Sequence, residues 1–294
     1  MKSMCLILPF FGSWPPWLNH FLQTCRYNPT VDWLLYSDCE RPDNLPANVR
    51  FVKAGLSDFN LLASRQLGMK ISIDNPYKLC DLKPAYGVIF ENFIRDHDFW
   101  GHTDLDIVYG NIRKFITNDL LQKHDIISTR KEYIAGHFTV FRNIHVVNSL
   151  YAEADNFEKI FLDKKLCFFD ECGGHCEELL QGRKLPELNN RRTSMTHLVI
   201  EKNRRNIKIF FTAFAQEDRI LEVYENRADW EFLWSAGTLV CGWDRKEVMY
   251  LHLLSSKKDP AFVCSPSREK QTSFHINRRG IFFPQVDGRP EFPA

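Results

Sequence analysis

The sequence predicts an α/β protein with a mostly parallel central sheet flanked by helices. Short apolar runs alternate with helical patterns over the first half of the chain, which is typical of βαβ units. Polar residues follow two of these runs where each ends, and ligands bind at the carboxyl ends of parallel strands. The 294 residues, 44% of them hydrophobic, are enough for one large α/β domain.

In the first half, strands are expected at 4–10, 31–38 and 49–54, and helices after the prolines of WPPWLNHFLQTCRY, at 56–68 and at 83–94. Ser57 is the candidate N-cap of the 56–68 helix, and Gly68 its C-terminal stop. The helix over 83–94 leads into FWGHTDLDIVYGN (99–111), a buried strand followed by a turn.

The second half is less regular and predicts a small antiparallel part. Strands are expected at 124–130, 135–143, 206–214, 237–243 and 247–254, the last two as a hairpin through Asp244-Arg245. Helices are expected at 144–162 and directly after Asp170-Glu171. The tail from Ser265 is rich in Ser, Arg and Pro and is expected to be irregular. We therefore predict one domain over 1–264 and a C-terminal extension over 265–294.

Composition narrows the classes of function. A formal charge of +1 argues against nucleic acid as a partner, which needs a basic face. The chain has no run of 18 apolar residues, so the sequence predicts no membrane span. Nine scattered cysteines favour reduced thiols in a cytoplasmic protein. Cys167, Cys172, His175 and Cys176 lack the spacing of a structural zinc site, so ordinary packing is the favoured interpretation.

Two aspartates, Asp104 and Asp106, flank Leu105 at the end of the buried strand. Residues i and i+2 of a strand point to the same face, so the two carboxylates converge. Burying two like charges is costly unless a cation lies between them. Mn²⁺ and Mg²⁺ prefer oxygen ligands and bind carboxylates together with substrate phosphates. A solvated turn is the alternative, because D-x-D motifs also occur by chance.

The stretch EVMYLHLLSSKKD adds His252, Lys257 and Lys258 near the end of the predicted domain. A neutral imidazole suits Mn²⁺ as a further ligand, and two ammonium groups suit a diphosphate. From the residues alone, a core histidine with a backbone partner is the favoured alternative for His252.

The order YSD, DLKP, FWGHTDLD, AGHFTVFRN, FFDE and LHLLSSKK resembles that of GT-A-fold glycosyltransferases, which use nucleotide sugars. The likeness is strongest to proteins of bacterial capsule and O-antigen gene clusters, and covers roughly residues 4–258. It implies a Rossmann-like GT-A fold, with a nucleotide-binding half at 1–106 and an acceptor-binding half at 107–264.

The resemblance implies roles for the residues at the predicted strand ends. Asp106 would bind Mn²⁺ or Mg²⁺ directly, Asp104 would contact the metal or the ribose, and His252 would complete the metal site. The lysine that binds phosphate in glycogenin-like enzymes corresponds to Lys258. Because the glycine that precedes it in those enzymes is missing here, Lys257 could serve instead.

Four further residues gain roles by position. Asp38 would bind the nucleoside, and Lys83 the nucleotide or diphosphate, with a surface lysine at a helix start as the alternative. Gly136 would let a ligand approach the backbone. His137 would contact the acceptor, with a buried or surface histidine as the alternative.

An inverting enzyme of this kind uses a carboxylate base, and Asp170 and Glu171 lie about where it is expected. Acids also favour the first turn of a helix, which is the alternative for this pair. The residues leave inversion and retention of stereochemistry equally open.

The expected function is a metal-dependent glycosyltransferase that moves a sugar, typically from a UDP-hexose, to a lipid-linked glycan of a bacterial surface polysaccharide. This implies a cytoplasmic enzyme, with peripheral contact at the inner face of the membrane. The aromatic and basic tail could touch that surface, and a packed extension explains it equally well; its residues are Phe274, Arg278, Arg279, Phe282 and Phe283.

Two rival functions stay open. DLDIV also fits the nucleophile motif of haloacid-dehalogenase-like phosphatases, with Asp104 as nucleophile and Asp106 as acid/base. That family has its motif near the start of the chain and a later acidic pair. A nucleotide-sugar-binding module without catalysis is the second rival.

Overall fold

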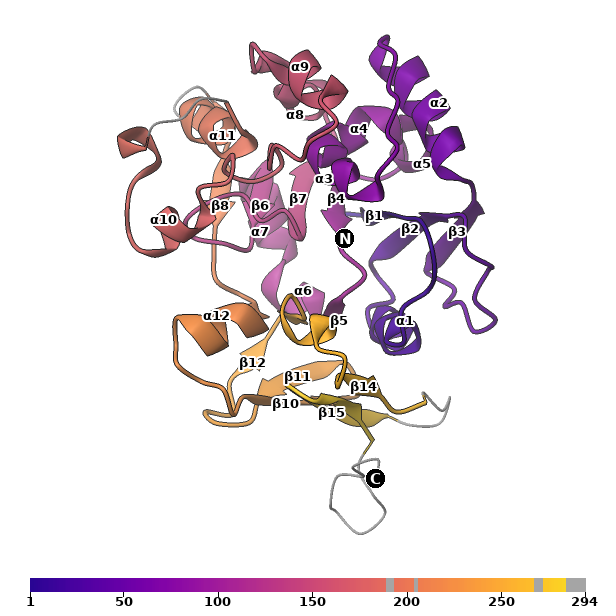
Figure 1. The fold of residues 1–294 in the computed structure, drawn as a ribbon, viewed down its shortest axis with the longest axis vertical. Coiled ribbons are helices and arrows are strands. Elements are labelled where there is room, and N and C mark those ends of the chain that lie inside the picture. The colour runs from indigo at the N-terminus through magenta and orange to yellow at the C-terminus, as the bar shows by residue number, and fades with distance from the viewer. Residues whose placement is uncertain (189–192, 204–205, 267–271, 284–294) are drawn as a thin grey trace.

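The structure, a computed structural model, describes residues 1–188, 193–203, 206–266 and 272–283. A seven-stranded sheet forms the centre of its larger part (Figure 1). The strand order is β3 (Val49–Lys53), β2 (Asp32–Ser37), β1 (Met4–Phe10), β4 (Phe99–Thr103), β7 (Phe138–Arg142), β6 (Ile126–Ser128) and β8 (Ile209–Phe211).

The sheet is parallel from β3 to β4, and only β7 runs antiparallel to both of its neighbours. The predicted α/β class with a mostly parallel sheet is therefore confirmed. Its assignment to the GT-A fold stays a prediction.

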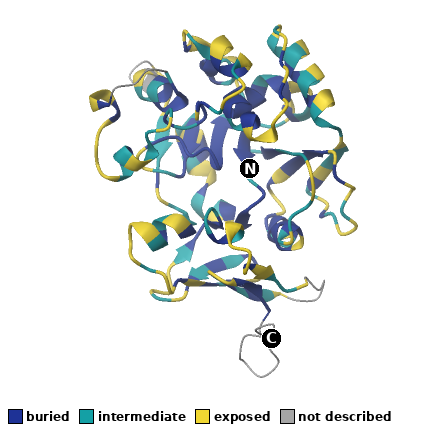
Figure 2. Ribbon diagram, in the orientation of Figure 1, coloured by how far each residue is buried: buried dark blue, intermediate teal, exposed yellow. Residues whose placement is uncertain are grey.

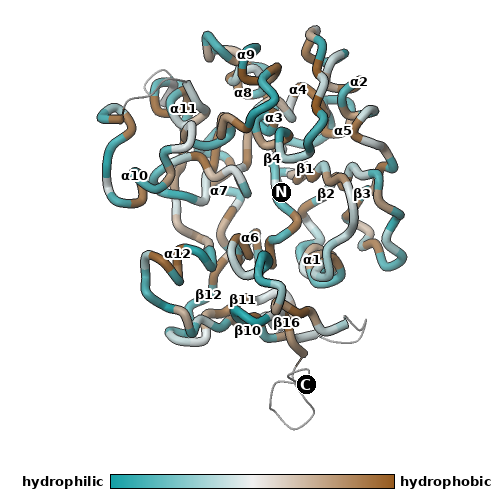
Figure 3. The backbone as a smooth tube through the Cα atoms, viewed as in Figure 1, coloured by the Kyte–Doolittle hydropathy of each residue, from teal (hydrophilic) through white to brown (hydrophobic). Residues whose placement is uncertain are grey.

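Both faces of the central sheet are covered, which explains its continuous apolar strands. In β1, Cys5 and Ile7 belong to one apolar cluster, and Leu6 and Leu8 to the other. The buried and hydrophobic colours accordingly follow β1 and β2 in Figures 2 and 3.

Among the described residues, ten helices cover these two faces. The first face carries α2 (Leu56–Leu67), α3 (Leu79–Leu82), α4 (Tyr86–Ile89), α5 (Glu91–Ile94), α8 (His145–Asn148), α9 (Phe157–Leu162) and α11 (Met195–Asn203). The second carries α1 (Leu18–Arg26), α6 (Ile112–Phe115) and α7 (Asn118–Lys123).

Three helix predictions need correction. The helix over 83–94 is broken into α4 and α5 at Phe90, whose side chain is fully buried among Tyr36, Phe59 and Tyr86. The helix over 144–162 is likewise divided into α8, a short 3₁₀ turn and α9. The N-cap of α2 is Gly55 rather than Ser57, because the Asp58 carboxylate accepts the Gly55 N–H at 2.7 Å.

A second, mostly antiparallel sheet lies beside the first (Figure 1). It contains β12 (Glu247–Val248), β11 (Thr238–Cys241), β10 (Glu231–Ser235), β15 (Ser273–Asn277), β16 (Gly280–Phe282) and β14 (Val263–Cys264). The predicted hairpin through Asp244-Arg245 is confirmed for β11 and β12, but β10 was not expected from the sequence.

The prediction of an irregular tail is wrong for residues 273–282. β15 and β16 come from that segment, and β15 lies between β10 and β16 inside the second sheet. Phe274, Phe282 and Phe283 are buried there, which removes them from any membrane surface, while Arg278 and Arg279 are exposed. Residues 267–271 and 284–294 of the predicted extension lie outside the described residues.

A three-stranded sheet joins the two larger ones. It contains β5 (Ile107–Tyr109), β13 (Tyr250–His252) and β9 (Gln216–Glu217). The predicted strand over 247–254 is therefore two strands in different sheets, because the chain crosses at Met249, whose N–H donates to the Phe214 carbonyl at 2.7 Å. No helix in the described part of the chain has the length and apolar character needed to cross a bilayer.

His20 joins α1 to the second sheet, and its burial makes stability depend on pH. Its ring packs against Phe274 and Phe283, with centroids 5.3 and 5.4 Å away, and neither ring nitrogen has a hydrogen-bond partner among the described residues. Burial lowers the pKa of His20 from 6.5 to about 4. Between these values the unfolded chain binds a proton that the folded chain does not, so stability falls as the pH falls.

We expect this group to remove about 3 kcal/mol of unfolding free energy between pH 6.5 and 4. His20→Leu should flatten the pH dependence measured by urea unfolding over this range, whereas the same change at exposed His145 should not. An unchanged slope in His20→Leu would contradict the assignment.

Candidate metal and substrate site

The D-x-D motif lies where the chain leaves the central sheet. β4 ends at Thr103, and β5 begins directly after Asp106 in the three-stranded sheet. Leu105 is buried as expected, Asp106 is buried, and the Asp104 side chain is about one-third exposed, at 34%. Asp104, Leu105 and Asp106 form the turn between β4 and β5, so the prediction that the two carboxylates share one face of a strand is wrong. The strands on either side hold this turn in place.

The same small sheet brings His252 and Glu217 to the motif. His252 pairs with Ile107 of β5 on one side and with Glu217 of β9 on the other. The Leu253 N–H donates to the Asp106 carbonyl at 2.9 Å. Residues far apart in the sequence are thus adjacent because of strand register.

The predicted ligands converge as a group. One ligand atom each from Asp104, Asp106 and His252 lies within 4.8 Å of the others. His252 Nε2 is 3.3 Å from Asp106 Oδ2, and His252 Nδ1 donates to Glu217 Oε2 at 3.0 Å. Two carboxylates and one imidazole suit Mn²⁺ or Mg²⁺, so this donor set fits the expected metal.

Electrostatics explain how these charges are tolerated in the interior. Burial alone would raise the pKa of Asp106, but His252 and Lys257 outweigh burial and hold that pKa well below its usual range. Burial alone would lower the pKa of His252, but Asp106 and Glu217 raise it to about 10. A metal ion bound at Nε2 would therefore have to displace the proton from this nitrogen.

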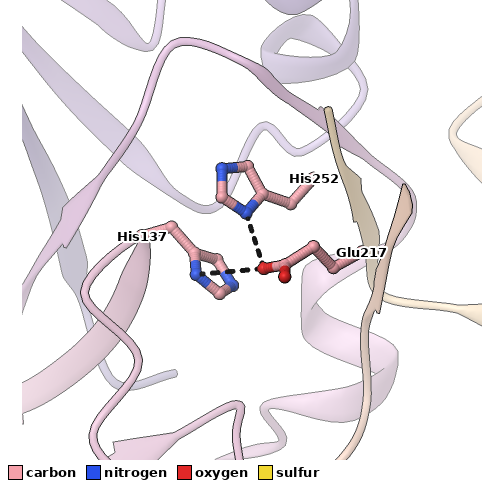
Figure 4. A group of neighbouring side chains, drawn as sticks. All are labelled: His137, Glu217 and His252. Carbon is pink, nitrogen blue, oxygen red and sulfur yellow. Dashed lines mark hydrogen bonds and ion pairs between the residues drawn. The ribbon is translucent and has the colours of Figure 1, made fainter. Parts of the chain in front are cut away.

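His137, Glu217 and His252 form a second cluster of possible ligands (Figure 4). The Arg130 guanidinium lies 2.7 Å from Glu217 Oε2, the oxygen that also faces His252 at 3.0 Å. A metal ion at this oxygen would meet the guanidinium charge. Glu217 is better explained as the carboxylate that orients His252, an arrangement common behind metal-binding histidines.

His137 is buried, and its ring contacts other side chains of the protein. Its Nε2 lies 2.7 Å from the Tyr250 hydroxyl, and its ring stacks on His252 with centroids 4.2 Å apart. Of the two interpretations from the sequence, the structure favours the buried histidine, and acceptor contact stays a prediction.

The three predicted lysines have different surroundings. Lys83 is buried and donates to Asp104 Oδ1 at 2.6 Å and to the Gly136 carbonyl at 2.7 Å, so it is not the surface lysine of the alternative. Burial alone would lower its pKa, but Asp104 raises it well above 10.5. Lys257 contacts Asp106 Oδ2, and Lys258 is exposed.

Asp218, which the sequence did not single out, fixes the segment that carries the last two lysines. Its buried carboxylate accepts the N–H groups of Ser255, at 2.9 Å, and Ser256, at 2.7 Å. The acidic pair Glu217-Asp218 after an apolar run was the available signal. Only the fold reveals that Glu217 bonds to His252, whereas Asp218 bonds to the backbone that precedes Lys257.

Asp170 and Glu171 are not at a helix start, so that alternative is wrong. α10 (Cys176–Leu180) begins later, after Gly173 and Gly174 adopt positive φ angles of 71° and 93°. Burial, followed by the neighbouring Glu171 charge, raises the pKa of Asp170 well above its usual range. Burial likewise raises the pKa of Glu171, so both are stronger bases than exposed carboxylates.

Gly136 makes room for this acidic pair. A Cβ at residue 136 would lie 2.6 Å from Asp170 Oδ2 and 2.7 Å from Glu171 Oε1. The Gly136 N–H also donates to Glu171 Oε1 at 3.2 Å. The close approach predicted for a ligand is thus made by these two carboxylates.

Two cavities of about 450 Å³ each meet at the D-x-D motif. The β1 cavity lies at the ends of β1 and β4, lined by residues 8–11, Trp17 and Thr103. The acid cavity is lined by Gly136, His137, Asp170, Glu171, Glu217 and His252. Residues shared by both are Tyr77, Cys80, Lys83, Asp104, Asp106, Lys257 and Lys258.

Two predicted features lie apart from this centre. Asp38 lines neither cavity, and its carboxylate accepts the Gly12 N–H at 2.9 Å. Cys172 and Cys176 have sulfurs 3.1 Å apart, but His175 is directed to Glu178. No cysteine belongs to a possible metal-ligand group among the described residues.

Glu217→Gln tests the role of the carboxylate behind His252. We expect Mn²⁺ affinity, measured by calorimetric titration, to fall about 10–100-fold, because the His252 ring loses its anionic partner. Glu177→Gln is the matched control, since Glu177 binds Arg219 at the same cavity. Equal Mn²⁺ affinity in Glu217→Gln and the wild type would contradict the role.

The chain was compared with known proteins. It matches the family of unknown function DUF6625 over residues 6–283, and a search of curated proteins finds no match. The matched span contains the D-x-D motif, the acidic pair, Glu217 and His252. The match covers nearly the whole chain, so the protein belongs to the DUF6625 family.

Proposed function

We propose that this protein is a metal-dependent glycosyltransferase that uses a nucleotide sugar. One observation carries the proposal: Asp104, Asp106 and His252 converge at the boundary between two cavities. A transferase needs this arrangement, because donor and acceptor must approach from different sides and meet at one centre.

The β1 cavity suits the donor nucleotide. The chain passes from β1 to β2 and β3 on one side, and then crosses to β4 on the other side of β1. The strand order therefore reverses between β1 and β4, and open α/β sheets bind nucleotides in the crevice at that point. Phe10, Phe11 and Trp17 give this cavity aromatic walls for a base.

Asp104, Asp106 and His252 would hold Mn²⁺ or Mg²⁺, which stabilises the negative charge of a departing diphosphate. Lys257 and Lys258 line both cavities and supply further positive charge for that diphosphate. By the resemblance, the donor is a UDP-hexose.

The acid cavity suits the acceptor. Asp170 or Glu171 would take the proton of the acceptor hydroxyl, because both side chains line this cavity. A lipid-linked glycan of a surface polysaccharide remains the proposed acceptor.

Asp106→Asn tests the donor site. Thermal unfolding would be followed with UDP-, GDP-, dTDP- and CMP-sugars, with and without Mn²⁺. A ligand at about 100 times its dissociation constant stabilises by about 2.7 kcal/mol, a shift of a few degrees. We expect a Mn²⁺-dependent shift with one nucleotide class, which Asp106→Asn abolishes and Asp155→Asn, at an exposed residue outside both cavity linings, retains.

The same panel separates the rival functions. Phosphate release from a phosphomonoester without any nucleotide shift would support the phosphatase. A nucleotide shift that is unchanged in Asp106→Asn and needs no metal would support the non-catalytic module.

Lys257→Met should change two affinities in opposite directions. Lys257 contacts the Asp106 oxygen that a metal would need, so its removal should strengthen Mn²⁺ binding measured without nucleotide. UDP binding in the presence of Mn²⁺ should weaken, because a phosphate partner is lost. Lys258→Met should weaken only UDP binding, and weaker Mn²⁺ binding in Lys257→Met would refute this account.

A further inference from the structure

The mouth of the acid cavity gathers the exposed aromatic side chains of the protein. Among the described residues, the exposed aromatic side chains are Tyr77, Phe168 and Tyr224, at 71%, 43% and 38% exposure, and all three line this cavity. They come from three segments far apart in the sequence. Aromatic residues make up 14% of the chain, and exposed ones spread at random over the surface would not all line the same cavity.

Phe168 is held outward by its neighbours. The buried Asp81 carboxylate accepts the N–H groups of Cys167 and Phe169, each at 2.8 Å, and forms an ion pair with Lys78 at 2.7 Å. Phe169 enters the core, and Phe168 adopts a φ of 55° and faces the cavity. A bulky residue at positive φ is a strained outlier, and such strain is found mainly at functional sites.

The charges of this cavity indicate a neutral ligand. Lys83 is paired with Asp104, Lys257 with Asp106, and Arg219 with Glu177 at 2.6 Å. Lys258 lies at the boundary shared with the β1 cavity, so the rest of the described lining offers an anion no lysine or arginine outside these pairs. Asp170 and Glu171 add no positive charge, but their oxygens can hydrogen-bond to the hydroxyls of a neutral ligand, which a purely apolar ligand lacks.

We propose that Tyr77, Phe168 and Tyr224 bind pyranose rings of a neutral glycan, so that the acceptor is recognised by its sugars rather than by a lipid or an anionic group. The C–H faces of a sugar ring pack on aromatic rings, and its hydroxyls can bond to the Glu177–Arg219 pair. A volume of about 450 Å³ accepts more than one ring. That this glycan is the acceptor rests on the proposed function, but its binding does not.

The test uses a printed array of neutral and acidic glycans, and vesicles of phosphatidylglycerol and phosphatidylethanolamine. The wild-type chain with Mn²⁺ and UDP should bind neutral glycans on the array and neither vesicle. Phe168→Gly, which removes the ring at a φ suited to glycine, should weaken that signal about tenfold. Phe168→Tyr should restore it, and Val146→Ala, an exposed apolar residue of α8 outside the cavity lining, should leave it unchanged.

Three outcomes would overturn the inference: no binding to any neutral glycan, a preference for acidic glycans or vesicles, or equal binding by Phe168→Gly and the wild type. Thermal shifts with nucleotide and Mn²⁺, measured on the same samples, show whether the donor site is intact. Glycan binding without a nucleotide shift would refute the proposed function and leave this inference standing. A nucleotide shift without glycan binding would do the reverse.

Discussion

The burial of the Asp106 carboxylate is the constraint on which the site depends. A buried anion is tolerated only with cations in direct contact, and its neighbours form a row of alternating charges: Lys257, Asp106, His252, Glu217 and Arg130. Each member compensates the next, and removing an inner member takes away one of the partners of each neighbour. The raised pKa of His252 and the lowered pKa of Glu217 both follow from this arrangement. The row is therefore a structural element as well as a possible binding site.

The three-stranded sheet positions three members of this row of charges. β5 supplies the Asp106 end, β13 carries His252 and β9 carries Glu217, so backbone hydrogen bonds set the spacing of three charged side chains. The same strands join the central sheet to the antiparallel one. The fold thus places the buried Asp106 carboxylate at the junction of its two larger sheets, where only 5% of the residue is exposed.

The sequence predicted what depends on local pattern. The strands at 4–10, 31–38 and 49–54 follow from period and spacing, and His252 followed from a family resemblance. Asp104 and Asp106 converge as expected, but across a turn between β4 and β5 rather than along one strand. Glu217 and Arg130 could not be found this way, because only strand register and a side-chain ion pair bring them to His252. The prediction of one continuous helix over 83–94 was wrong because the tertiary packing of Phe90 outweighed local helix propensity. The tail was misjudged because its polar composition conceals alternating buried residues such as Phe274 and Ile276.

The two cavities differ in the charged side chains that line them, so the two sides of the D-x-D motif are not equivalent. Lys257 and Lys258 lie at the shared boundary, whereas Asp170 and Glu171 lie only on the acid cavity. Lys83 is 4.0 Å from Asp170 and 2.6 Å from Asp104, so one ammonium group serves acids on both sides of the boundary. Under the proposed function, the anionic diphosphate of a donor beside Lys83 would share its positive charge and leave the Asp170 carboxylate less compensated, which favours the protonated acid. Lys83 would thereby couple the proton affinity of Asp170 to occupancy of the donor cavity.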